Sequence, residues 1–139
     1  MSERLTIDDL KRFIDTSPFI RFLGLEIEEV DEAKGVLAMK MPMRPELERA
    51  DGTGQVHGGP IASLIDTVGD FAVILTVGAP VPTINFRTDY LRPAGGSYLI
   101  GKATVRRAGR TVAVVDIDVF DDQGRLCAIG RGCYGSKAG

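Results

Sequence analysis

Two carboxylates, Asp66 and Asp70, lie within a run of almost entirely apolar residues at positions 61–75. The apolar residues recur at helical spacing, so we expect a helix that is buried around most of its circumference. Because the two aspartates are four residues apart, they share one face of that helix. Burial and mutual repulsion should raise the pKa of one of them. Buried carboxylates serve as general bases or nucleophiles; we assign that role to Asp66, and a structural or edge role to Asp70.

The segment His57-Gly58-Gly59-Pro60 leads into this helix, and Pro60 suits the first helical position, where a missing N–H costs nothing. The glycine pair has two interpretations. It allows a tight entry to the helix, and its backbone N–H groups can hold an oxyanion. His57 is the only histidine, and both a structural and a functional role stay open for it. One histidine and two distant cysteines do not supply the three or four ligands that zinc needs.

Arginines are frequent in the later part of the chain. They are Arg87, Arg92, Arg106, Arg107 and Arg110. Charged residues at strand ends and turns are usually just solvated, but clustered arginines also hold phosphates. We therefore expect some of them to contact a phosphorylated ligand.

The elements that must position these residues follow from the periodicity. We expect a short helix at 6–15, a hairpin of strands at 25–30 and 35–41, a loop at 42–59, the central helix, and strands at 81–92, 97–107, 111–121 and 125–135. Short turns between consecutive strands indicate antiparallel pairing, so the fold class is α+β. The chain offers no second layer for the far side of the helix. We expect a second subunit to cover it, with Gly69 allowing another backbone to approach.

Composition narrows the class of protein. A chain of 139 residues predicts one domain, residues 1–139, and its net charge of −2 argues against a nucleic-acid partner and an anionic membrane surface. Cys127 and Cys133 lie in one strand-like run, where six residues span about 20 Å, too far for a disulfide. Reduced cysteines, a charged start unlike a signal peptide and no apolar run of about 20 residues favour a cytoplasmic protein without a membrane span.

The pattern Gly54-x-x-His57-Gly58-Gly59-x6-Asp66, at the start of a long apolar helix that follows a hairpin, resembles the hotdog-fold acyl-CoA thioesterases. The phenylacetate-degradation (PaaI-like) branch is the most similar. The strand end Asp89-Tyr90-Leu91-Arg92-Pro93-Ala94 and the turns at 105–110 and 122–128 continue the resemblance, which covers about residues 18–135.

This resemblance implies a sheet wrapped around the central helix, homodimers that often pair into homotetramers, and active sites at the dimer interface. The Gly58 N–H, beside Gly59, would polarise the thioester carbonyl. Asp66 of the other subunit would activate water or attack directly. His57 would help to place the thioester, and Thr83, on the first strand after the helix, would assist. No metal or other cofactor is implied, and Arg92, Arg107 and Arg110 are the candidates for binding the phosphates of CoA.

One position departs from the family pattern. Related enzymes often carry asparagine six residues before the histidine, where its amide helps to bind the carbonyl, and this chain has Asp51 there. An ionised carboxylate cannot donate that hydrogen bond. We therefore expect Asp51 to be hydrated and turned aside, with its carboxylate bonded to loop N–H groups.

The resulting hypothesis is a thioesterase that hydrolyses acyl-CoA or a similar thioester. A non-catalytic acyl-binding or assembly protein on the same fold is the alternative, since fold does not fix function. Asp66 discriminates between them, because a protein that only binds has no reason to bury it. A hotdog dehydratase needs a histidine and a carboxylate as an acid–base pair, and the order of the motif does not fit that chemistry.

Overall fold

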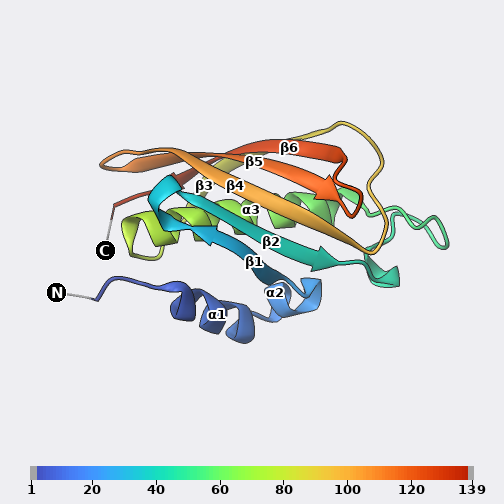
Figure 1. Ribbon diagram of the computed structural model, residues 1–139, viewed down its shortest axis with the longest axis horizontal. Coiled ribbons are helices and arrows are strands. Elements are labelled where there is room, and N and C mark those ends of the chain that lie inside the picture. Colours follow the sequence, from blue (N-terminus) through green and yellow to red (C-terminus); the bar gives the residue numbers. More distant parts are fainter. Residues whose placement is uncertain (1–2, 138–139) are drawn as a thin grey trace.

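A long helix, α3 (Gly58–Val77), lies against one face of a six-stranded antiparallel sheet (Figure 1). The computed structural model describes residues 3–137. The strands are β1 (Glu26–Asp31), β2 (Val36–Pro42), β3 (Thr83–Tyr90), β4 (Tyr98–Ala108), β5 (Val112–Asp121) and β6 (Leu126–Gly135), in the order β1-β2-β4-β5-β6-β3. The predicted α+β hotdog fold is confirmed, and the strand bounds agree with the predicted ones to within two residues.

The sheet and α3 pack closely because glycines face the helix. A Cβ at Gly101 of β4 would lie 2.9 Å from Leu64 Cγ, and one at Gly130 of β6 would lie 2.7 Å from Ile65 Cγ2. Both α3 side chains are fully buried. Bare backbone on two strands therefore lets the branched side chains of α3 reach the sheet, which fixes the position of the helix.

Gly69 of α3 is also a point of close approach, but within one chain. It is buried, and a Cβ there would collide with the hydroxyl of Tyr134, a fully buried side chain of β6. That hydroxyl donates a hydrogen bond to the backbone oxygen of Asp66 at 3.0 Å. The prediction that Gly69 admits the backbone of a second subunit is therefore wrong, because Tyr134 fills the space.

The N-terminal segment supplies part of the cover that we expected from a second subunit. Helices α1 (Ile7–Thr16) and α2 (Pro18–Leu23) follow one another in this segment, and α1 contacts the second half of α3. Figure 1 shows both helices outside the sheet, at the N-terminal end of the chain. The rings of Phe13 and Phe71 are 6.5 Å apart. Arg4 donates to the backbone oxygens of Leu75 and Thr76 at 2.7 and 2.8 Å, where a cation suits the carbonyl end of the helix. We predicted that nothing within the chain covers the side of α3 that faces away from the sheet. That prediction is wrong for the second half of α3, which the N-terminal segment contacts.

The structure tests the predictions for the two cysteines and for a membrane-spanning run. Cys127 and Cys133 are both free thiols, as predicted. By length and composition α3 is apolar enough to cross a membrane, so the prediction that no such run exists is wrong. More than half of it is buried inside the protein, which is the environment of a core helix.

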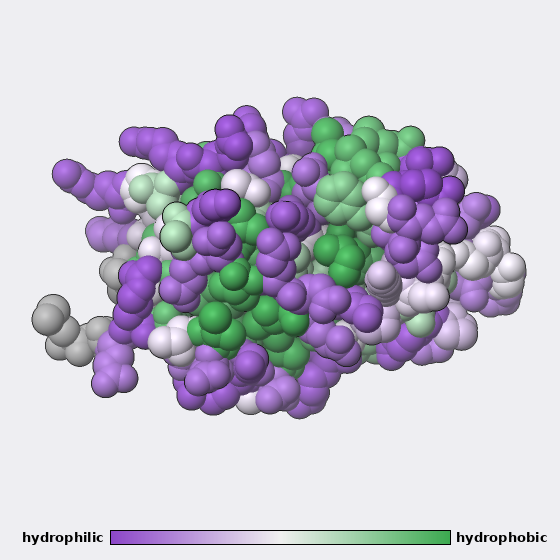
Figure 2. All heavy atoms as spheres, in the orientation of Figure 1, coloured by the Kyte–Doolittle hydropathy of each residue, from purple (hydrophilic) through white to green (hydrophobic). Residues whose placement is uncertain are grey.

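Apolar surface is unevenly distributed. Figure 2 shows one side of the molecule that is largely hydrophilic, with apolar side chains gathered in separate areas. The exposed large apolar residues include Phe19 and Phe22 of α2, Ile84 and Tyr90 of β3, and Leu91 just after it. Since β3 is one edge of the sheet, part of this apolar surface lies along an edge that can pair with another strand.

Candidate active site

The start of α3 is set by a histidine. His57 is the N-cap, and its Nδ1 accepts a hydrogen bond from the Gly59 N–H at 2.9 Å. Its own backbone N–H donates to the Leu47 oxygen at 2.8 Å. The helix therefore begins at Gly58 and not at Pro60 as predicted. Sequence reasoning missed the cap because serine, threonine, aspartate and asparagine are the usual residues there.

The two glycines consequently have different roles. The N–H of Gly59 is engaged by His57. Gly58 occupies the first helical position, whose N–H has no acceptor within the helix, and no hydrogen bond from it is found within residues 3–137. Gly58 therefore offers a backbone donor at the positive end of the helix dipole, which is the property that an oxyanion site requires.

A tyrosine on the edge strand contacts this donor residue. The hydroxyl of Tyr90 donates to the backbone oxygen of Gly58 at 2.7 Å. The two residues share a groove of about 450 Å³ whose other walls include Val56, Ile61 and Leu91. The sequence motif that contains Tyr90 predicted only a strand end. The contact spans 32 positions in the chain, so no local pattern could reveal it.

The carboxylate of Asp66 lies two turns further along α3. The hydroxyl of Thr83, the first residue of β3, donates to Asp66 Oδ1 at 2.8 Å. The structure thus brings together the two residues that the family resemblance pairs. A carboxylate oriented by a hydroxyl donor, on the part of α3 that the sheet leaves partly exposed, is placed to accept a proton or to attack.

Asp70 differs from Asp66. Burial and, to a smaller extent, the negative charge of Asp66 raise the pKa of Asp70 to about 7. No hydrogen bond to its carboxyl group is found among the described residues. Burial, with smaller effects from both carboxylates, also raises the pKa of the nearby Tyr134 hydroxyl. The predicted raised pKa is therefore confirmed, and it belongs to Asp70.

Gly58 and Asp66 are too far apart to act on one bond within a single chain. They are eight residues apart on one helix, which corresponds to about 12 Å along its axis. An oxyanion donor lies about 3 Å from the reacting oxygen, and a base is in hydrogen-bond reach of the attacking water. One copy of the chain therefore presents two partial sites, one at each of these positions.

The candidate phosphate-binding arginines are not gathered in one place. Arg92 follows the end of β3, where Tyr90 pairs with Ala128 of β6 and Ala128 pairs with Val119 of β5. Arg107 of β4 pairs instead with Val114 of β5. Val114 and Val119 are five residues apart along β5, a distance of about 17 Å. Arg110 follows in the β4–β5 turn, on the side of Arg107. One chain therefore places Arg92 near Gly58 and the other two at the far end of the sheet.

Asp51 is exposed in the loop that precedes α3. Its carboxylate accepts no hydrogen bond within residues 3–137, and the Gly54 N–H of that loop donates instead to Glu48 Oε2 at 3.0 Å. The expected exposure of Asp51 is confirmed. The expectation that it bonds to loop N–H groups is wrong, because Glu48 occupies that position.

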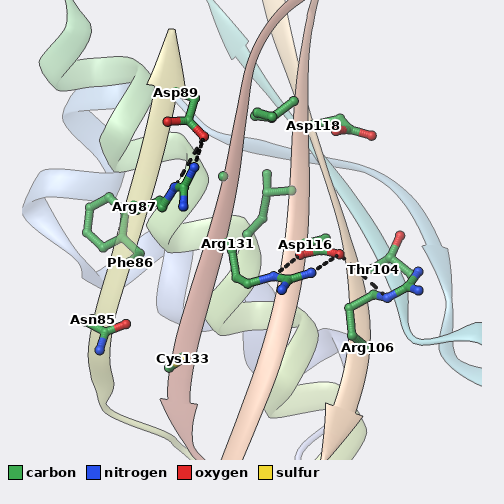
Figure 3. Close-up of a pocket in the computed structure, with 13 residues that line it drawn as sticks. Asn85, Phe86, Arg87, Asp89, Thr104, Arg106, Asp116, Asp118, Arg131 and Cys133 are labelled. Atoms are coloured by element: carbon green, nitrogen blue, oxygen red, sulfur yellow. Dashed lines mark hydrogen bonds and ion pairs between the residues drawn. The ribbon is translucent and has the colours of Figure 1, made fainter.

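A hollow of about 810 Å³ lies on the outer face of the sheet, away from α3 (Figure 3). All but one of its charged residues are paired with one another: Arg131 donates to Asp116 at 2.6 and 3.0 Å, Arg106 lies 3.6 Å from the same carboxylate, and Arg87 lies 2.9 Å from Asp89. Asp118 is the charged lining residue outside these pairs. The bond from Arg131 lowers the pKa of Asp116. Neither Gly58 nor Asp66 lines this hollow, so we place the site on the other face of the sheet.

Metal ligands are not gathered either. Within residues 3–137, no three side chains of histidine, cysteine, aspartate or glutamate come together in a way that could hold a metal ion.

The fold and the glycine–aspartate helix define a class of hydrolases, and the chain belongs to the thioesterase superfamily, whose family model matches residues 53–128. Human acyl-coenzyme A thioesterase 13 is 32% identical over 125 residues, covering 88% of this chain and 87% of that protein. A Halobacterium salinarum protein named as a presumed esterase is 37% identical over 136 residues, covering 90% and 88%. The solved structure of E. coli PaaI, from the phenylacetic acid degradation operon, has a TM-score of 0.83 at 25% identity, covering 96% and 93%. The resemblance to the PaaI-like branch is therefore confirmed.

Proposed function

We propose that this protein hydrolyses acyl-CoA thioesters to a free acid and CoA at sites formed between two copies of the chain. The observation that carries the proposal is the pair of partial sites on α3. One is a free N–H at Gly58, and the other is a carboxylate at Asp66 that Thr83 orients. Two copies related by a two-fold axis would bring the Gly58 of each to the Asp66 of the other.

In this mechanism Asp66 removes a proton from water, and the resulting hydroxide attacks the thioester carbon. The carbonyl oxygen gains the negative charge and is stabilised by the Gly58 N–H at the start of α3. Collapse of this intermediate breaks the C–S bond, and the proton on Asp66 passes to the departing thiolate. Direct attack by Asp66 followed by hydrolysis uses the same two residues. His57 keeps Gly58 exposed by capping the N–H of Gly59.

The two edges of the sheet support pairing through β3. β1 carries four acidic residues among six, and this charge discourages strand addition. β3 has eight residues and exposes 54% of Ile84 and 53% of Tyr90. A homodimer joined at β3, alone or as half of a homotetramer, would cover this edge.

The substrate class rests on relatives that are named as acyl-CoA thioesterases. The test is a screen of the purified protein against aliphatic and aromatic acyl-CoAs with detection of the released thiol. We expect turnover of at least one of them, abolished by Asp66→Asn. Absence of turnover across the panel would contradict the proposal and favour an acyl-binding role.

CoA recognition is a separate part of the proposal. We expect Arg92 of one copy, together with Arg107 and Arg110 of another, to attract the phosphates of CoA. A CoA thioester should then show a KM that rises with salt, whereas its pantetheine counterpart should not. Equal KM values with no salt effect would contradict a role for these arginines.

A further inference from the structure

Tyr90 ties the end of the edge strand to the first residue of α3. Its hydroxyl donates to the Gly58 oxygen at 2.7 Å, although more than half of the side chain is exposed. In a regular helix this carbonyl already accepts a bond from the N–H four residues later. The tyrosine bond is therefore not needed to satisfy a buried acceptor. Its effect is to restrain the Gly58–Gly59 peptide group and, through it, the backbone of Gly58 that carries the free N–H.

Gly58 would otherwise be free to move. Glycine has the widest backbone freedom of any residue, and the first turn of a helix lacks half of its hydrogen bonds. Three contacts restrain this turn: His57 N–H to the Leu47 oxygen, Gly59 N–H to His57 Nδ1, and Tyr90 to the Gly58 oxygen. Of the three, the Tyr90 bond is the one that joins an atom of Gly58 to a distant strand, and it adds to the helical bond that the same carbonyl accepts.

The contact also explains why this position is glycine. Gly58 has no left-handed backbone conformation that would require one. A Cβ at Gly58 would instead lie 3.0 Å from the Tyr90 Oη and 3.1 Å from its Cζ. The bare backbone of Gly58 and the tyrosine ring thus fit together as a pair, and the ring forms one wall of the groove that exposes Gly58.

We propose that Tyr90 is a positioning residue that holds the Gly58 N–H in the direction of the thioester carbonyl. This inference rests on the proposed function. Tyr90 acts through Gly58, and its hydroxyl transfers no proton. A preorganised donor stabilises the transition state more than a mobile one, because no reorganisation is needed as charge develops.

Tyr90→Phe tests the inference, since it keeps the ring and removes the hydroxyl. We expect kcat to fall about 3- to 30-fold, a part of the loss that follows removal of a whole oxyanion donor. KM should change by less than about twofold. The matched control is Tyr98→Phe on β4, whose ring lies under Lys40 and whose hydroxyl makes no hydrogen bond within the described residues. That control should retain wild-type kcat.

A spectroscopic readout separates positioning from general damage. In the Asp66→Asn background a thioester can be held without turnover, and the Gly58 N–H should shift its carbonyl stretch to lower frequency. Adding Tyr90→Phe should move the stretch back toward that of the free thioester. An unchanged kcat in Tyr90→Phe, or a reduced kcat with an unchanged carbonyl stretch, would overturn the inference. If wild-type protein hydrolyses no thioester, it is the proposed function that fails.

A second variant keeps the test independent of the tyrosine itself. Gly58→Ala retains the N–H but places a Cβ against the Tyr90 hydroxyl. It should lower kcat by about the same factor as Tyr90→Phe, and the double variant should lose no more than either one, because both break the same contact. Losses that multiply in the double variant would show that the two residues act separately.

Discussion

Asp66 and Asp70 are the same residue type, one turn apart on the same helix, and yet they have different environments. Asp66 accepts a hydrogen bond from Thr83 on β3. Asp70 has no donor among the described residues, and burial raises its pKa to about 7. The edge strand begins with the Thr83 hydroxyl beside Asp66, whereas no hydroxyl among the described residues donates to Asp70.

A buried carboxylate on a core helix is therefore not by itself evidence of catalysis. Desolvation raises the pKa of Asp70 to about 7, but no donor among the described residues orients its carboxyl group. The Thr83 hydroxyl bond holds the Asp66 carboxylate in one orientation, as a base or nucleophile requires. A neighbour that orients the carboxylate distinguishes the two positions.

The largest expected effect is on turnover. Asp66→Asn keeps the shape of the side chain and removes the base, so kcat should fall about 10²- to 10⁴-fold. Asp70→Asn should leave kcat at neutral pH within about threefold of wild type. Steady-state kinetics on both variants checks this. If Asp70→Asn is as inactive as Asp66→Asn, the assignment of roles must be redrawn.

The next effect concerns stability and its pH dependence. Because the pKa of Asp70 is higher in the folded state than its usual 3.8, the folded state binds more protons, and stability falls as pH rises from about 4 to about 7. Asp70→Asn removes this loss and should add on the order of 2–4 kcal/mol of stability above pH 7 but little below pH 4. Urea unfolding across this range measures it. Equal pH dependence in both proteins would show that Asp70 is solvated.

A smaller effect is expected at the hydroxyl that distinguishes the two aspartates. Thr83→Val removes the donor to Asp66 and should lower kcat about tenfold, the value of one hydrogen bond to a charged group. Thr83→Ser keeps the hydroxyl and is the matched control, with activity close to wild type. Equal loss in both variants would point to packing by the threonine methyl group instead.

The smallest effect is expected at Asp51. Its exposed carboxylate lies in a loop and accepts no hydrogen bond within residues 3–137, so Asp51→Asn should leave activity intact or raise it. Asparagine would add a donor where an ionised carboxylate offers none. The same kinetic assay decides it. A loss as large as that of Asp66→Asn would make Asp51 catalytic.

Sequence periodicity was sufficient for the elements and for the position of Asp66 on the central helix, because both depend on local spacing along the chain. What it missed depends on contacts between distant segments. Tyr134 fills the space beside Gly69, and Tyr90 reaches Gly58 from the far end of β3. The cap of α3 was missed for another reason, since His57 is an unusual residue at that position. Register and packing, which no single stretch encodes, decide these contacts.

The central claim is that Gly58 of one copy and Asp66 of another serve the same thioester. Gly58→Pro removes the donor N–H. The backbone suits proline, which is favoured at the first helical position, and His57 already has the extended ψ of 149° that must precede it, although the proline Cβ meets Tyr90 as an alanine Cβ does. Gly58→Ala keeps the N–H and serves as its control for the added side chain. Homomeric Gly58→Pro and homomeric Asp66→Asn should both be nearly inactive.

The most direct test is a hybrid of these two variants, co-expressed with different tags and purified through both. If the site spans two copies, one of the two sites in each hybrid dimer contains both native residues, and activity should return to about half of the wild-type value. If Gly58 and Asp66 act within one chain, every chain in the hybrid carries one defect. A hybrid as inactive as its parents would contradict the account.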